Sequence, residues 1–150
     1  MVASSPQPPQ TPPSVPAAVI DTSAWISRLL PTDSNHAAAR KWIDQHLLGG
    51  GLLVAPVLLV VEVAAAASRQ TRRPAIAQRA VTQLYNLPQL SLVPIDQALI
   101  DSATDLATDL AIRGADALFV ALARQLNIPL VTFDAEQIQR PASIIQTIRP

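Results

Sequence analysis

The segment from Arg113 to Asp134, RGADALFVALARQLNIPLVTFD, constrains the fold more than any other part of the sequence. Its first half has a wide apolar face at helical spacing, and residues 130–133 form a short apolar run typical of a strand buried in a parallel sheet. Asp116 stands at the start of the helix and Asp134 follows the strand. A helix that crosses back beneath a sheet brings both carboxylates to the edge where strands end and helices begin. Open α/β sheets bind ligands at that edge, so the segment predicts a site there.

The rest of the chain alternates between short apolar runs and amphipathic segments. Residues 1–16 are rich in proline, serine and glutamine and carry no charge, so we expect a disordered tail before one domain over residues 17–150. Strands are expected over 17–20, 52–55, 90–94, 130–133 and 142–147, and helices over 37–48, 56–69, 74–86, 96–112, from Asp116 onward and over 135–139. This alternation predicts a three-layer α/β/α sandwich with a parallel sheet of about five strands.

Composition narrows the classes of protein that fit. At 150 residues the chain can bury the core of one domain, and the absence of cysteine excludes disulfides and thiolate metal sites and fits a reducing cytoplasm. Basic and acidic residues balance at eleven each, so no general field attracts nucleic acid or anionic lipid. Aromatic residues are few, which argues against a surface that stacks on several bases. We therefore expect any ligand to be held by a local site.

Asp21 is placed to reach the same edge as Asp116 and Asp134. It follows the apolar segment 17–20 and precedes Thr22 and Ser23, as at the tip of a strand that leads into a helix. A second interpretation is that this aspartate only caps the helix. The sequence alone leaves both interpretations open.

Glu62 is the one charged residue in the apolar stretch 52–67. Burying an isolated carboxylate on a helix is costly, so a buried glutamate there needs a cation. The alternative is that Glu62 lies on the one solvent-exposed face of the helix. A membrane span explains the stretch less well, because Pro56 and the glutamate interrupt it and no second such segment follows. We expect a helix packed on the sheet, with Glu62 close to the same edge.

Four acids at one sheet edge require compensation. Two carboxylates about 4 Å apart repel by roughly 4 kcal/mol at an effective dielectric of 20, and four repel more. Either some stay protonated or a divalent cation lies among them, and a set of oxygen ligands without cysteine favours Mg²⁺ or Mn²⁺. Such an ion polarises a phosphoryl oxygen and activates a bound water, the two requirements of phosphodiester hydrolysis. The sequence predicts this chemistry for Asp21, Glu62, Asp116 and Asp134.

Other charged residues fit the site less closely. A small basic cluster is either a phosphate-binding surface or an ordinary polar loop, and it consists of Arg69, Arg72, Arg73 and Arg79. Three aspartates at four-residue spacing occupy the outer side of the helix over 96–112, and they are Asp101, Asp105 and Asp109. We assign none of the three to catalysis and expect Asp109 to reach Arg113 one turn on.

Four segments, VIDTSAWI, APVLLVVEV, GADALFVALA and LVTFD, resemble in order and spacing the four acidic motifs of the PIN domain family. The resemblance covers about residues 17–150. It implies a metal-dependent nuclease acting mainly on RNA, with Asp21, Glu62, Asp116 and Asp134 as the acidic metal site for one or two Mg²⁺ or Mn²⁺ ions. Ser23 is similar to the small polar residue that helps to arrange that site, and Thr132 matches the hydroxyl residue before the last acid.

The resemblance also implies partners. Small single-domain members are typically VapC-like toxins, so an antitoxin protein, a homodimer and a cytoplasmic RNA substrate are expected, with no membrane. A further acid follows the last motif in some members, and Glu136 is only a loose candidate for it. Two alternatives stay open: a catalytically weak PIN-like domain that binds RNA or a partner, and a housekeeping RNA-processing nuclease.

Overall fold

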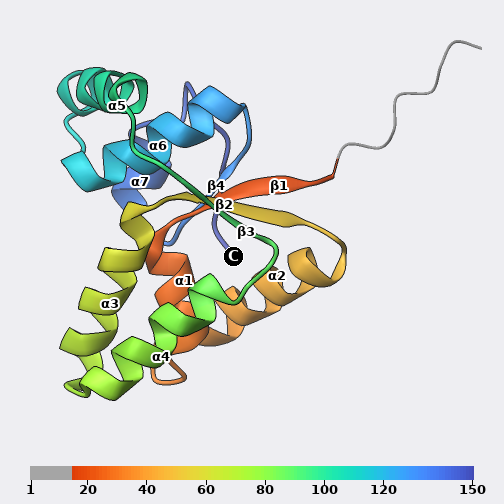
Figure 1. Ribbon diagram of the computed structural model, residues 1–150. Coiled ribbons are helices and arrows are strands. Elements are labelled where there is room, and N and C mark those ends of the chain that lie inside the picture. Colours follow the sequence, from red (N-terminus) through yellow and green to blue (C-terminus); the bar gives the residue numbers. More distant parts are fainter. Residues whose placement is uncertain (1–14) are drawn as a thin grey trace, which may run out of the picture.

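A five-stranded parallel sheet forms the centre of the computed structural model, which describes residues 15–150 (Figure 1). The strand order is β3-β2-β1-β4-β5. The strands are β1 (Ala17–Ile20), β2 (Leu52–Pro56), β3 (Leu90–Val93), β4 (Leu130–Val131) and β5 (Thr147–Ile148). The prediction of a parallel sheet with five strands is confirmed. The predicted disordered tail lies outside the described residues, except for its last two positions.

Helices cover both faces of the sheet. Figure 1 shows α1 to α4 on one face and α5 to α7 on the other, which confirms the three-layer sandwich. In the described part of the chain the helices are α1 (Thr22–Leu29), α2 (His36–Leu48), α3 (Leu58–Thr71), α4 (Pro74–Tyr85), α5 (Gln97–Leu110), α6 (Gly114–Leu126) and α7 (Ala135–Gln139).

The strand order creates a crevice between β1 and β4. The chain runs outward through β1, β2 and β3, then returns through α5 and α6 to place β4 on the other side of β1. Val19 pairs with Leu130 and Ile20 with Val131, and the amide of Asp21 continues the ladder to the Val131 carbonyl at 3.0 Å. Such a reversal of strand order is where open α/β sheets leave room for a ligand.

Pro56 differs from its predicted place in the first turn of a helix, because it ends β2 and pairs with Val93. The amides of Leu53 and Val57 donate to the carbonyls of Gln89, just before β3, and of Val93 at its end, and amides alternate in direction along a strand, so the amide of position 56 would face β1. The register with β1 ends at Val54. A residue without an N–H group therefore leaves no donor unpaired there.

The last strand also begins later than predicted. It was expected over 142–147, with Ile144 and Ile145 at its centre, but β5 is a two-residue strand. The amides of Ile144 and Ile145 both donate to the carbonyl of Pro141, at 2.9 and 3.1 Å, and this turn delays the pairing with β4. The strand β4 is likewise shorter than predicted, although the Thr132 amide still donates to Ile148.

The core fills both faces of the sheet, and on one of them it lies against α6, the helix with the most buried residues. Its buried face consists of Ala117, Phe119, Val120, Ala121, Leu122 and Ala123. Three of these are alanines, which let the helix approach β1 and β2 closely, and the aromatic ring of Phe119 fills the remaining volume.

In residues 15–150 no helix has the length and apolar character that a membrane crossing requires. The apolar stretch 52–67 is divided between β2 and α3. β2 is a strand of the sheet and α3 packs against it, so the stretch does not form one continuous helix.

Phe119→Ala tests the core. Phe119 is fully buried, so truncation removes its buried surface and leaves a cavity, and we expect the free energy of unfolding to fall by about 3–5 kcal/mol in urea denaturation. Tyr85→Ala is the matched control, because Tyr85 is 63% exposed and its truncation should change stability by less than about 0.5 kcal/mol. Equal losses for both variants would contradict this placement of the core.

Candidate functional site

A pocket of about 220 Å³ opens at the carboxyl edge of the sheet, where β1 and β4 end. The residues that line it come from four parts of the chain, and they are Asp21, Thr22, Ser23, Glu62, Arg113, Ala115, Asp116 and Asp134. All four acids singled out in the sequence are among them, as is Ser23. Thr132 is fully buried and hydrogen-bonds to Asp21.

Asp21 follows β1 and is the most buried of the four acids, at 4% exposure. Its Oδ2 accepts hydrogen bonds from the Ser23 amide at 3.1 Å, the Ser23 hydroxyl at 2.6 Å and the Thr132 hydroxyl at 3.0 Å. The first of these bonds caps α1. The two interpretations of Asp21 are therefore compatible, because the capping aspartate also lines the pocket.

Two hydroxyl groups connect the end of β1 to the chain after β4. The Ser23 hydroxyl accepts from the Phe133 amide at 3.0 Å, and the Thr132 hydroxyl accepts from the Asp134 amide at 3.0 Å. The two oxygens lie 3.2 Å apart. This network fixes the relative positions of Asp21 and Asp134, which come from distant parts of the sequence.

Asp134 caps α7, with Oδ1 accepting from the amides of Glu136 at 2.8 Å and Gln137 at 3.2 Å. The fully buried side chain of Gln137 donates through Nε2 to Asp21 Oδ1 at 3.3 Å. This glutamine is not among the site residues predicted from the sequence. Its position three residues after a capping aspartate matches the capping-box pattern, which is the sequence signal that could have pointed to it.

Glu62 and Asp116 complete the ring of acids from α3 and α6, and both side chains are half-buried. Burial raises the pKa of Glu62, the charges of Asp21 and Asp116 raise it further, and a hydrogen bond from Thr22 opposes this. Burial also raises the pKa of Asp116, against the lowering effect of Arg113. Both carboxylates are thus less favourable in their charged form than in water.

Arg113 bridges two of the acids. Its Nε donates to Asp116 Oδ2 at 2.8 Å, and its Nη2 donates to Asp134 Oδ2 at 2.9 Å. These ion pairs replace the expected contact with Asp109, which lies exposed on α5. The sequence signal was an arginine three residues before an acid at a helix start, a spacing that places the two side chains together.

The donor chemistry of the pocket fits a divalent ion that keeps part of its water shell. No hydrogen bond from residues 15–150 reaches Asp116 Oδ1 or Glu62 Oε1, so both oxygens are available as ligands. Within the same residues, no three histidine, cysteine or carboxylate side chains already form a set that could hold a metal ion together. Mg²⁺ commonly binds through one or two carboxylates and several waters, so the pocket fits that ion.

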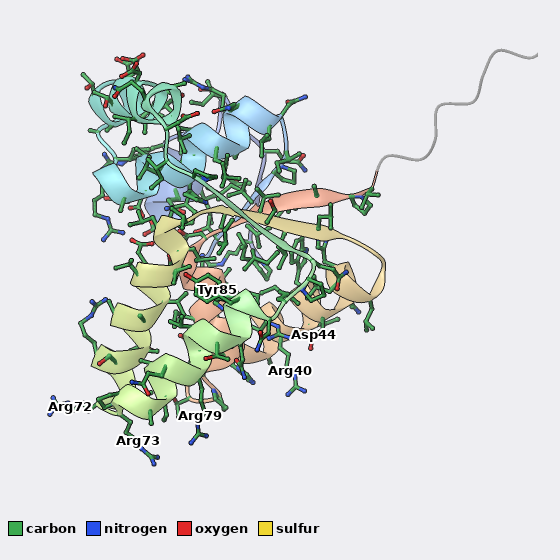
Figure 2. All side chains as sticks on the ribbon, in the orientation of Figure 1. Arg40, Asp44, Arg72, Arg73, Arg79 and Tyr85 are labelled. Atoms are coloured by element: carbon green, nitrogen blue, oxygen red, sulfur yellow. The ribbon has the colours of Figure 1, made fainter. Side chains whose placement is uncertain are left out.

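The other sequence candidates lie outside the pocket. Arg69, Arg72, Arg73 and Arg79 are exposed, and Figure 2 shows the last three projecting from the α3–α4 pair. Ten residues of helix, roughly 15 Å at 1.5 Å per residue, separate Glu62 from Arg72. Glu136 is exposed and pairs with Arg140 at 3.2 Å, away from the four acids.

Comparisons with known proteins agree on the architecture. The family model described as PIN domain matches residues 18–142. No curated protein sequence matches the chain.

Three solved structures with the same fold are all distant in sequence. The chain resembles VapC20 of Mycobacterium tuberculosis, described as a Sarcin-Ricin loop cleaving toxin, with a TM-score of 0.71 and 17% identity over 89% of this chain and 99% of that one. For VapBC2 from Rickettsia felis, bound to a DNA fragment from its promoter, the TM-score is 0.63 and the identity is 14%, over 88% of this chain and 97% of that one. For a toxin-antitoxin complex from Klebsiella pneumoniae the TM-score is 0.57 and the identity is 16%, over 89% of this chain and 97% of that one.

Thr132→Val tests the hydroxyl network. Valine keeps the shape of the buried side chain but leaves the Asp134 amide without its acceptor and removes one donor to Asp21, so we expect a loss of about 1–3 kcal/mol of unfolding free energy. The control is Thr82→Val, at an exposed helix position where the hydroxyl donates only to the Gln78 carbonyl. If thermal and urea unfolding show no difference between the two variants, the network does not hold the site together.

Proposed function

The chain belongs to the PIN domain family, and from this premise we propose that it is a metal-dependent endoribonuclease, the toxin of a toxin–antitoxin pair. The observation that carries the proposal is the meeting of Asp21, Glu62, Asp116 and Asp134 around one pocket at the reversal of strand order. Within residues 15–150 no histidine, cysteine or lysine lines this pocket, and such a ring of carboxylates suits a divalent ion better than it suits a protein nucleophile.

In this proposal Asp21 and Asp116 hold the principal Mg²⁺ or Mn²⁺, and Glu62 and Asp134 complete the site directly or through water. The bound ion would polarise the scissile phosphate and lower the pKa of a water. Ser23 and Thr132 position the carboxylate of Asp21 through the hydrogen bonds to its Oδ2. A second ion would need a further ligand, and Glu136 would have to leave Arg140 to supply one.

RNA as the substrate is supported by the similarity to VapC20, whose description names cleavage of the Sarcin-Ricin loop. The exposed arginines at positions 69, 72, 73 and 79 would hold phosphates at a distance from the cut. Electrostatic grip of this kind is local, since the whole chain has no net charge.

An antitoxin and a homodimer belong to the same proposal, as does action in the cytoplasm. The Klebsiella pneumoniae match is a toxin-antitoxin complex, which supports the first partner. On the surface of this chain, Val57, Val61 and Tyr85 are 42%, 65% and 63% exposed at and beside α3 and α4. Where exposed apolar side chains form a continuous patch, they favour contact with another protein chain.

Asp116→Asn is the cleanest test of the catalytic site. Asp21 accepts four hydrogen bonds, so its replacement also perturbs the fold, whereas Asp116 accepts one, from Arg113. We expect the Asn variant to cut a fluorescent single-stranded RNA at least about 100-fold more slowly with Mg²⁺ or Mn²⁺, because it loses a charged ligand. Circular dichroism should stay unchanged.

Asp105→Asn provides the matched control, since Asp105 is an exposed aspartate on α5 that does not line the pocket. It should cut RNA at the parent rate. Parent-like cleavage by the Asp116 variant, or cleavage by the parent in excess EDTA, would contradict metal-dependent catalysis at this pocket.

Expression in a bacterial host separates a toxin from a processing enzyme. We expect induction of the parent chain to arrest growth and the Asp116→Asn chain to leave growth normal, since arrest by a toxic nuclease requires cleavage. Growth curves after induction, with Asp105→Asn as the control that still arrests, provide the measurement. Active RNA cleavage in vitro without growth arrest would favour the housekeeping nuclease.

A further inference from the structure

Arg113 is the one basic side chain, among residues 15–150, that lines the acid pocket. Its two ion pairs reach side chains that are mostly covered, because Asp116 is 15% exposed and Asp134 is 23% exposed. Arg113 itself is 70% exposed. The guanidinium therefore lies on the solvent side of two carboxylates and occupies oxygens that a cation would use.

A divalent ion bound directly to Asp134 competes with the guanidinium for Oδ2, because Asp134 Oδ1 already accepts two amide hydrogen bonds, and an ion bound to both oxygens of Asp116 competes in the same way. The two positive charges repel each other, and in this structure Asp116 Oδ2 and Asp134 Oδ2 both accept hydrogen bonds from Arg113. Ion pairs of an exposed arginine are weak, and the ordering of its long side chain opposes them. An ion with twice the charge can therefore displace it while the carboxylates stay in place.

The displaced side chain is suited to a phosphate. Without Arg113 the described part of the chain lines the pocket with four acids and no positive side chain, so an entering phosphate would be repelled. The neighbouring arginines are engaged elsewhere: Arg140 donates to the carbonyls of Leu110 and Ala111, and Arg149 lies 5.6 Å from the ring centre of Phe133. A guanidinium at the rim can bind two phosphate oxygens at once.

We propose that Arg113 exchanges partners: it holds Asp116 and Asp134 in the metal-free protein, and it binds the phosphate of the substrate once a divalent ion has taken these carboxylates. The inference rests on the proposed function for the identity of that phosphate. In this exchange Arg113 is both a competitor of the metal and a ligand of the substrate. Its removal should therefore raise the affinity for the metal and lower the affinity for the phosphate.

The first measurement is Mn²⁺ affinity, by calorimetry on the metal-free protein. Arg113→Ala should bind Mn²⁺ about three- to tenfold more tightly than the parent, the range expected from two exposed ion pairs. Arg40→Ala is the matched control, because Arg40 is 67% exposed and pairs with Asp44 on α2, a helix that does not line the pocket (Figure 2). It removes the same charge and should leave Mn²⁺ affinity unchanged.

The second measurement is phosphate affinity, with a nucleoside 5′-monophosphate as the probe and the protein saturated with Mn²⁺. Arg113→Ala should bind the probe about tenfold more weakly, since a charge-assisted bidentate contact is lost. Arg113→Lys keeps the charge without the forked geometry, so its affinity for the probe should lie between those of the parent and Arg113→Ala. A merely structural role for Arg113 would weaken both ligands together or neither.

Unchanged Mn²⁺ affinity in Arg113→Ala relative to Arg40→Ala would overturn the exchange, as would unchanged affinity for the monophosphate. Absence of any Mn²⁺ binding by the parent would also overturn it. These assays involve no cleavage. If the parent binds both probes as expected and cuts no RNA, the nuclease proposal fails while the exchange stands.

Discussion

Repulsion among four carboxylates at the carboxyl edge of the sheet is the constraint on which the rest of the site depends. Three of them stand where helices begin: Asp21 caps α1, Asp134 caps α7 and Asp116 lies in the first turn of α6. The positive end of a helix stabilises a nearby anion by about 0.3–1 kcal/mol. The hydroxyls of Ser23 and Thr132 add hydrogen bonds, and these contributions offset part of the repulsion.

Compensation is incomplete at the two half-buried acids. The pKa of Glu62 and that of Asp116 both stay raised, chiefly by burial, even with Thr22 and Arg113 in contact with them. A pocket in this condition gains free energy from any further positive charge. Arg113 supplies one charge, and a divalent ion in our proposal supplies two. The same repulsion thus accounts for the arginine beside the acids and, in our proposal, for the binding of a divalent ion.

Much of this arrangement could be predicted from the sequence, because parallel strands joined by helices carry strand ends and helix starts to one edge. Asp21, Asp116 and Asp134 follow from that rule, and Glu62 follows from the cost of a carboxylate in an apolar helix. The rule fails where local chemistry decides. Pro56 fits an extended strand end as well as a helix start, and the turn at Pro141 depends on backbone bonds that no apolar pattern reveals.

The sequence also did not determine which side chains pair with one another. Arg113 has an aspartate at position 109 and another at position 116, and spacing alone does not say which one faces the same way. The fold decides, since α6 turns toward the pocket while the stripe on α5 faces solvent. Gln137 was equally ambiguous, because its partner Asp21 lies 116 residues away in sequence. Contacts of that range appear only once the strand order is known.

Crystals of the protein soaked in Mn²⁺, with data collected near the manganese absorption edge, test the central claim most directly. Our account predicts an anomalous peak in the pocket, within ligand distance of Asp116, with the Arg113 guanidinium withdrawn from Asp116 and Asp134. A peak elsewhere on the molecule, or an Arg113 that keeps both carboxylates at saturating Mn²⁺, would contradict it.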